Sequence, residues 1–334
     1  MYVVHSYALA VILCVVTMFC WGSWANTMKL AHKSWRFELF YWDYSLGVLL
    51  LTLIAGLTLG SSGEVGRPFG ADLSQAAGIP ISKALLGGAI FNLANILLVA
   101  AIEIAGMAVA FPVGIGLALI IGVITNYLAA PVGNVALLAV GVLLVTLAIV
   151  LDAVAYRRLA AGVASVSTKG LVLSVICGIL MGSFYRFVAA AMYADPALPE
   201  AGKMGPYAAV FVFAVGILLS SFVWNTLAMK KPFTGAPPVA FADYFKGSVG
   251  NHLTGLLGGL IWGVGMSLNL IASGSAGFAI SYGLGQGATM VAAFWGVFIW
   301  REFRSAPKGT ARLIAAMFAC FLVGLWLIVK ARAL

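Results

Sequence analysis

The hydrophobic residues of this 334-residue chain fall into long apolar runs, not into the alternating patterns of soluble helices and strands. Each run holds about 20 residues, the length that an α-helix needs to cross the hydrocarbon core of a bilayer. Charged or Gly/Pro-rich segments separate the runs, and we interpret the two longest, 61–82 and 193–205, as irregular loops. The pattern predicts ten transmembrane helices, with approximate limits 7–29, 38–60, 83–104, 107–128, 134–154, 169–192, 206–229, 251–272, 277–299 and 309–331.

Composition agrees with this pattern. Hydrophobic residues make up 63% of the chain and charged residues only 9%, with a mean hydropathy of +1.08. A soluble domain carries about 25% charged residues, so this chain has too few to cover a surface that faces water. No basic residue precedes the first apolar run, which begins at Tyr7, so we expect a permanent helix and not a cleaved signal peptide. The sequence therefore predicts an integral protein of the lipid bilayer.

The net charge of +9 has two possible explanations, a nucleic-acid partner or the positive-inside rule. The loops after the odd-numbered spans carry 13 basic residues, whereas the opposite side, with both chain ends, carries 5. This asymmetry favours the positive-inside rule, and no nucleic-acid partner is expected. It predicts a multi-pass protein of the plasma (inner) membrane, with cytoplasmic basic loops and both termini outside.

One glycine-rich motif occurs twice. "AGMAVAFPVGIG" at 105–116 begins the fourth span, and the related "AGFAISYGLGQG" at 276–287 begins the ninth. "LLGG" precedes each copy by the same interval, at 85–88 and 256–259. Glycine-rich membrane helices can look alike by chance, but the constant spacing favours a true repeat. Because five spans separate the copies, they cross the bilayer in opposite directions.

The predicted fold is an all-α integral membrane protein, with ten transmembrane helices arranged as a five-plus-five inverted repeat. Its expected parts are a first repeat at 1–154, a short cytoplasmic connector at 155–168 and a second repeat at 169–334. Inverted repeats are typical of secondary transporters, which bind their substrate near the bilayer midplane between the two halves.

Several segments resemble the ureide permease family of the drug/metabolite transporter superfamily. They are "MYVVHSYALAVILC" at the start, "WGSW" at 21–24, "YWDYSLGVLL" at 41–50, "LTLGSSGEVGRPFGADLSQ" and "GVGMSLNLIASGSAGFAISYGLGQGATMVAAFWGVFIWREFR" at 263–304. The resemblance implies a ten-helix, proton-coupled importer of small polar nitrogenous metabolites such as allantoin and nucleobases. Related bacterial sugar permeases share the architecture.

The chain departs from the family pattern at two places. Plant members carry a long central loop with a nucleotide-binding-like motif, but segment 155–170 is short and lacks G-x-x-x-x-G-K-[ST]. The "WGSW" region usually continues with proline, whereas this chain has Ala25. The sequence therefore gives no support for ATP-driven transport, and it leaves the identity of the substrate undecided.

Two charged residues, Asp43 and Arg186, lie inside predicted spans away from the helix ends, where burying a charge costs free energy. Asp43 is the candidate for binding a coupling proton; alternatively, it is an interfacial carboxylate capped by neighbouring tyrosine hydroxyls. Arg186 is a candidate for binding substrate carbonyl oxygens through its forked guanidinium. It could equally pair with a carboxylate or extend to the membrane surface.

Neutral polar and aromatic residues are the other candidates for a pocket. Amide side chains both donate and accept hydrogen bonds, as a ureide, nucleobase or sugar requires, and indole rings can stack on a flat ligand. For Trp24 and Trp295 a place in the interfacial aromatic belt is an equal alternative. Pro112 and Gly283, at corresponding positions of the repeat, are predicted hinges. With Arg186, the substrate-binding candidates are Trp21, Trp24, Asn26, Asn92, Asn95, Asn269, Tyr282, Gln286 and Trp295.

The sequence thus favours a secondary active transporter that takes up a small neutral polar solute, a ureide or a nucleobase, with protons. A nucleoside or pentose permease, another sugar permease and a drug or metabolite exporter are the alternatives. No catalytic motif occurs, and the four cysteines lack metal-ligand spacing, so we expect neither an enzyme nor a metal or cofactor. The sequence leaves open the oligomeric state and the choice between protons and sodium ions.

Overall fold

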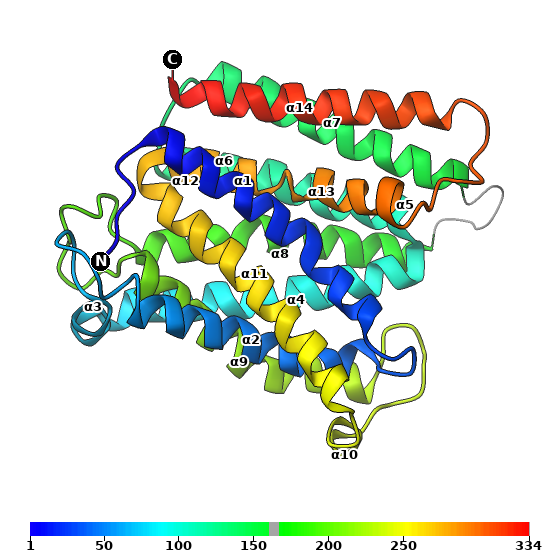
Figure 1. Cartoon of the computed structure of the whole chain (residues 1–334), viewed down its shortest axis with the longest axis horizontal. Helices are drawn as coiled ribbons and strands as arrows, with labels where there is room; N and C mark the ends of the chain where they lie inside the picture. Colours follow the sequence, from blue (N-terminus) through cyan, green and yellow to red (C-terminus); the bar gives the residue numbers. More distant parts are fainter. Residues whose placement is uncertain (160–166, 334) are drawn as a thin grey trace.

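The computed structural model describes residues 1–159 and 167–333. Regular secondary structure in these ranges is helical, and ten of the helices are long and apolar enough to cross a membrane (Figure 1). The prediction of an all-α integral membrane protein with ten spans is confirmed, and the observed limits lie within about five residues of the predicted ones.

Three of the ten spans are composite, because a change of helix type or a break interrupts them. In chain order the spans are α1 (Tyr7–Ser23) with the 3₁₀-helix η1 (Trp24–Leu30), α2 (Phe37–Leu57), α4 (Gly78–Ala105), α5 (Met107–Ala110) with the π-helix η2 (Phe111–Ile115) and α6 (Gly116–Ala129), α7 (Val135–Leu159), α8 (Thr168–Ala191), α9 (Pro206–Lys230), α11 (Val249–Ala276), α12 (Phe278–Gly285) with α13 (Ala288–Phe294) and the π-helix η3 (Trp295–Ile299), and α14 (Thr310–Ala333).

Two short helices lie in the connections between spans: α3 (Phe69–Gln75) precedes α4, and α10 (Phe241–Tyr244) precedes α11. The expectation of an irregular loop over 61–82 was therefore wrong for the part that α3 forms and for the first turn of α4. Seven residues are too few to show helical periodicity, which explains why the pattern did not reveal α3.

The bundle has two ends. We call the end that carries both chain termini and the loops after even-numbered spans the terminal face, and the opposite end the basic face. In Figure 1 both termini and α3 lie at the left, whereas α10 lies at the lower right. The loops with 13 basic residues belong to the basic face.

Helix packing follows the predicted inverted repeat. Helix α4 packs against α8 and α9, and its counterpart α11 packs against α1 and α2. Both α4 and α11 are 28 residues long and end at a glycine with positive φ, 76° at Gly106 and 86° at Gly277. An L side chain is strained in that conformation, which gives the repeated "AG" dipeptide a structural reason. Of the predicted connector 155–168, residues 155–159 continue α7 and residues 160–166 lie outside the described residues.

The repeated "LLGG" is a site of close helix crossing. A Cβ atom at Gly88 of α4 would lie 2.1 Å from the carbonyl oxygen of Phe213 on α9. A Cβ atom at Gly259 of α11 would lie 2.0 Å from the carbonyl oxygen of Tyr44 on α2. Only glycine permits this backbone approach, so the same motif forms the same crossing in each half.

Candidate functional site

A cavity of about 210 Å³ lies between the two sets of five spans. Its lining starts near the middle of α4 and α11, at Phe91 and Trp262, and continues to Phe37 and Ile102 at the basic-face ends of their helices. This central cavity therefore extends from the middle of the bundle toward the basic face. Its lining comprises Trp21, Gly22, Trp24, Ala25, Met28, Phe37, Phe91, Asn95, Leu98, Val99, Ile102, Phe111, Ile115, Met181, Phe184, Trp262, Gln286, Ala288, Thr289 and Ala292.

Aromatic rings form much of the wall. Trp21 of α1 and Trp262 of α11 are stacked, with ring centroids 5.8 Å apart and planes 12° apart. The ring of Phe91 lies 4.3 Å from that of Trp262, and the ring of Trp24 lies 4.7 Å from that of the buried Tyr44. These contacts hold the indoles in fixed orientations, so they present rigid faces on which a flat ring can stack.

A few neutral polar groups interrupt the aromatic wall. The amide nitrogen of Asn95 donates to the hydroxyl of Tyr41 over 3.2 Å, and this contact orients the amide. Within the described chain, the amide oxygen of Asn95 and the side chain of Gln286 make no hydrogen bond. Both are therefore available to a ligand. No ionisable side chain occurs among the lining residues that the structure describes.

Four of the predicted binding residues, Trp21, Trp24, Asn95 and Gln286, line the cavity. Asn92, one turn before Asn95, does not. Its amide nitrogen lies 3.1 Å from the carbonyl oxygen of Ile217 and 2.7 Å from the hydroxyl of Ser220. Asn92 therefore joins α4 to α9 inside the protein.

Asn269 and Tyr282 are also buried away from the cavity lining. The amide oxygen of Asn269 accepts from the Tyr185 hydroxyl over 2.7 Å, and its nitrogen donates to the Ser281 carbonyl over 2.8 Å. The Tyr282 hydroxyl lies 3.1 Å from the carbonyl oxygen of Met181. These groups connect α8, α11 and α12 on the terminal side of the cavity.

Asn26 and Trp295 meet neighbours toward the basic face. The Asn26 amide oxygen accepts from the indole of Trp300 over 2.7 Å, and the indole of Trp295 donates to the Ser23 hydroxyl over 2.9 Å. The rings of Trp295 and Trp300 stack, with centroids 6.1 Å apart. These contacts attach the end of α1 and η1 to η3 and the residue that follows it, and neither predicted residue lines the cavity.

Arg186 follows two residues after Phe184 on α8. Two residues turn a helix by about 200°, so Phe184 faces the cavity and Arg186 points away from it. The guanidinium is partly exposed and has no hydrogen bond or ion pair within the described ranges. In this conformation, therefore, no contact of Arg186 supports its predicted role in substrate binding.

The predicted hinges lie at irregular parts of the fourth and ninth spans. Pro112 is in the π-helix η2, whose neighbour Phe111 lines the cavity. Gly283 is inside α12, and the break in this span comes slightly later, at 286–287. Both irregular segments border the cavity.

Asp43 lies on α2 outside the cavity lining and is 6% exposed. One carboxylate oxygen accepts from the hydroxyl of Tyr244 over 2.6 Å, and the other lies 2.9 Å from Nδ1 of His252. Burial, together with the hydrogen bond and the charge of Asp43, raises the pKa of the Tyr244 hydroxyl. Asp43 therefore ties α2 to α10 and to the start of α11, and the neighbouring tyrosines predicted as its caps do not bind it.

The family model described as ureide permease matches residues 156–331, slightly more than half of the chain. The chain belongs to the ureide permease family. The resemblance seen in the sequence is thereby confirmed.

Two relatives named as ureide permeases match this family member over nearly its whole length, and a third matches part of it. Ureide permease 1 of Arabidopsis thaliana is 23% identical over 97% of this chain and 97% of its own. Ureide permease 4 of the same plant is also 23% identical, over 96% of each chain. Ureide permease 5 is 28% identical over 38% of this chain and 30% of its own.

A solved crystal structure shares the fold of this ureide permease family member. It superposes with a TM-score of 0.65, covers 98% of this chain and 99% of its own, and is 15% identical in sequence. Together with the ten apolar helices, membership of a permease family indicates a multi-pass membrane transporter and not an enzyme.

Sequence reasoning missed several residues of the cavity, among them Phe91, Met181, Phe184, Trp262 and Thr289. One signal was present, because Phe91, Asn95, Leu98 and Ile102 follow one another at intervals of three or four residues. Such a stripe marks one helix face. In a membrane helix, however, an apolar stripe can face lipid as well as a cavity, so the pattern alone did not distinguish them.

Proposed function

We propose that this chain is a secondary active transporter that takes up a small neutral polar solute, a ureide or a nucleobase, together with protons. The main supporting observation is the central cavity. Its wall combines stacked indoles with the unbonded amide oxygen of Asn95 and the unbonded amide of Gln286, and no ionisable residue occurs in the lining that the structure describes. The names of the relatives agree with a ureide cargo.

The composition of the cavity supports a neutral and planar cargo. A charged ligand would lose its hydration shell without meeting an opposite charge, which is costly in a low-dielectric site. A flat ring gains dispersion contacts by lying on an indole face. The amides of Asn95 and Gln286 can each donate and accept, so they match the alternating N–H and C=O edge of a ureide or nucleobase.

A nucleoside or pentose is the second candidate, because sugar rings also pack on indole faces and hydroxyl groups also bind amides. The cavity of about 210 Å³ is small for a whole nucleoside, which favours a single ring. Drug export is less consistent with the site, because organic cations need a carboxylate that the lining described here does not offer.

We infer that transport uses the two predicted repeats, 1–154 and 169–334, joined by the connector 155–168. Two halves of opposite orientation can exchange conformations, which closes the pathway at one end and opens it at the other. A cavity that reaches toward the basic face is consistent with one of these two states.

We propose Asp43 as the residue that carries the coupling proton. It is a buried carboxylate whose partners come from two other helices, so a change in its charge alters how α2 is held against α10 and α11. Its partners Tyr244 and His252 carry hydrogen-bonding groups and lie toward the basic face.

The cargo is tested first by thermal shift of the purified protein with ureides, nucleobases, nucleosides and pentoses. A ligand that binds only the folded state raises its unfolding temperature. We expect stabilisation by ureides or nucleobases, and a smaller shift in the Asn95→Ala variant. If only pentoses stabilise the protein, the ureide assignment is wrong and the protein is better assigned as a sugar permease.

Coupling is tested by uptake into proteoliposomes under an imposed pH gradient. The Asp43→Asn variant is expected to lose accumulation against a concentration gradient while keeping exchange of labelled for unlabelled solute. The exposed Glu64→Gln variant is the matched control and should accumulate normally. Accumulation by Asp43→Asn at the wild-type level would exclude Asp43 as the proton carrier.

A further inference from the structure

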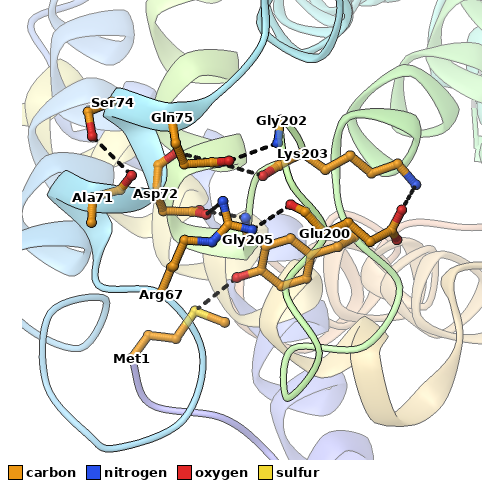
Figure 2. Close-up of polar contacts among 11 residues, drawn as sticks. Met1, Arg67, Ala71, Asp72, Ser74, Gln75, Glu200, Gly202, Lys203 and Gly205 are labelled. Atoms are coloured by element: carbon orange, nitrogen blue, oxygen red, sulfur yellow. Dashed lines mark hydrogen bonds and ion pairs between the residues drawn. The ribbon is translucent and has the colours of Figure 1, made fainter.

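The terminal face carries a dense polar cluster that joins the two halves of the protein (Figure 2). One side of it is α3 with the loop before it, from the first half. The other side is the loop between α8 and α9, from the second half. We call this cluster the clasp and define it by Arg67, Asp72, Gln75, Glu200, Gly202, Lys203 and Gly205.

Asp72 is at the centre of the clasp and its side chain is only 2% exposed. One carboxylate oxygen accepts from the backbone N–H of Gly205 over 2.6 Å, and the other lies 3.8 Å from the guanidinium of Arg67. The same guanidinium donates to the backbone carbonyl of Glu200. Two charged side chains of the first half thus bind the backbone of the second.

Gln75, one turn after Asp72, makes a second pair of bonds to the same loop. Its amide oxygen accepts from the N–H of Gly202 over 2.8 Å, and its amide nitrogen donates to the carbonyl of Lys203 over 2.9 Å. Beside it, the N–H of Ala77 donates to the carbonyl of Gly202 over 2.8 Å. These bonds fix the loop in one register against α3, because each requires a particular backbone group.

The clasp is closely packed as well as hydrogen-bonded. A Cβ atom at Gly205 would lie 2.4 Å from the hydroxyl oxygen of Tyr193. The same hydroxyl contacts the sulfur of Met1 at 3.8 Å, and the terminal amino group of Met1 donates to the carbonyl of Val65 over 2.8 Å. The start of the chain thus closes one side of the clasp, as Figure 2 shows.

The corresponding position on the basic face is not clasped. The interval between the two glycine-rich motifs relates α3 to α10 and Asp72 to Asp243. The side chain of Asp243 is 37% exposed, and its bonds go to the N–H of Ala240 and to Lys246, both within the same segment. Other residues do join the halves on this face, including Arg36 with the backbone carbonyl of Pro237 and Lys29 with Glu302, and the cavity reaches toward it. The two faces therefore differ at the equivalent positions of Asp72 and Asp243.

We propose that the clasp is the gate that seals the transport pathway at the terminal face, with Asp72 and Gln75 as its gating residues. In the alternate state the clasp separates and the terminal face opens. This inference rests on the proposed transport function. Because the clasp bonds reach one short loop from one short helix, they can break together when the halves move.

The gate can be tested without knowing the cargo, by labelling a cysteine in the cavity. Thr289→Cys is introduced after removal of the two partly exposed cysteines, Cys20 and Cys320, and a membrane-impermeant maleimide is applied from one side of oriented vesicles. We expect fast labelling from the basic face and slow labelling from the terminal face.

Loss of a clasp bond should open the terminal face. Asp72→Ala and Gln75→Ala, made separately, are each expected to raise the labelling rate from the terminal face about 10-fold, the effect of losing one such hydrogen bond. Ser74→Ala is the matched control on the same helix, since its hydroxyl bonds only Ala71 of α3 and should leave the rate unchanged. Wild-type rates in both clasp variants would overturn the proposal.

A crosslink provides the opposite test. A Cβ atom at Gly202 would lie 3.2 Å from Cβ of Ala77, slightly closer than the usual separation in a disulfide, and Gly202 has a positive φ of 79°. An oxidised Ala77→Cys/Gly202→Cys pair therefore needs a small backbone shift to hold the clasp shut, and the reduced double variant is its reference. Oxidation should suppress terminal-face labelling below the wild-type rate, and reduction should restore it. If the labelling rate is the same before and after oxidation, the clasp is not a gate. A wrong cargo assignment would not affect this measurement, because it needs no cargo.

Discussion

At the scale of single residues, the direction in which a polar side chain points decided its role. Asn92 and Asn95 are one turn apart on α4, yet Asn95 lines the cavity and Asn92 binds α9. The two positions differ by about 60° around the helix axis, which is enough to pass from one neighbour to another. Asp43 and Asp72 likewise resemble each other in the sequence, but they bind groups on opposite faces of the protein.

The charge of Asp72 has a testable consequence for stability. Burial raises the pKa of this carboxyl, and the N–H of Gly205 and the charge of Arg67 only partly oppose that effect. The folded state therefore binds the proton more tightly than the unfolded state. The stabilising contribution of the Asp72 carboxyl is present below its ordinary pKa of 3.8, and it is lost as the pH rises through the raised pKa of the folded state.

Asp72→Asn keeps an acceptor for the N–H of Gly205 but has no carboxyl group to ionise. We therefore expect this variant to escape the loss of stability as the pH rises. Its unfolding temperature relative to the wild type should increase as the pH is raised above about 4. Thermal unfolding in detergent over a pH series measures the difference, and the matched control is the exposed Asp195→Asn variant. A difference that does not change with pH would show that Asp72 does not titrate as inferred.

At the scale of helices, glycine sets the distance between neighbours. Gly88 and Gly259 occupy equivalent crossings, where another helix backbone lies too close for a Cβ atom. The sequence predicted the repeat through these "LLGG" motifs, and helix packing supplies the reason for it. The short helices α3 and α10 gave no such signal, because they are held by side-chain bonds to segments distant in the chain, a loop for α3 and helix α2 for α10.

Adding a methyl group at a crossing should force the two helices apart. Gly88→Ala and Gly259→Ala are each expected to lower the free energy of unfolding by roughly 1–3 kcal/mol, the usual penalty of overpacking. Gly78→Ala on α4 and Gly250→Ala on α11 are the controls, because a Cβ atom at these positions meets open space or an ordinary contact. Equal stability of crossing and control variants, measured by unfolding in detergent, would contradict the packing argument.

At the scale of the whole molecule, charge and shape both distinguish the two ends. The basic face carries most of the cationic loop residues, whereas the terminal face carries the clasp and both chain ends (Figure 1). In cells the membrane potential and the insertion machinery retain basic loops in the cytoplasm. We therefore propose that the terminal face is outside and that the described conformation is open to the cytoplasm.

Epitope tags test this orientation. Tags at either chain end should bind antibody on intact cells, whereas a tag in loop 300–309 should bind only after permeabilisation. The reverse pattern would place the clasp at the cytoplasmic side and make the central cavity open outward.

The sequence by itself determined the ten spans, since they depend on the length of apolar runs along the chain. From the spacing of the glycine motifs it predicted two opposed repeats. It also identified Trp21, Trp24, Asn95 and Gln286 among the residues of the cavity. Only the tertiary structure decided that Asn269 and Tyr282 are internal supports, and that Asp72 meets Gly205. The physical reason is that helical periodicity defines the face of a residue but not the neighbour that covers it. That neighbour comes from packing between segments far apart in the chain.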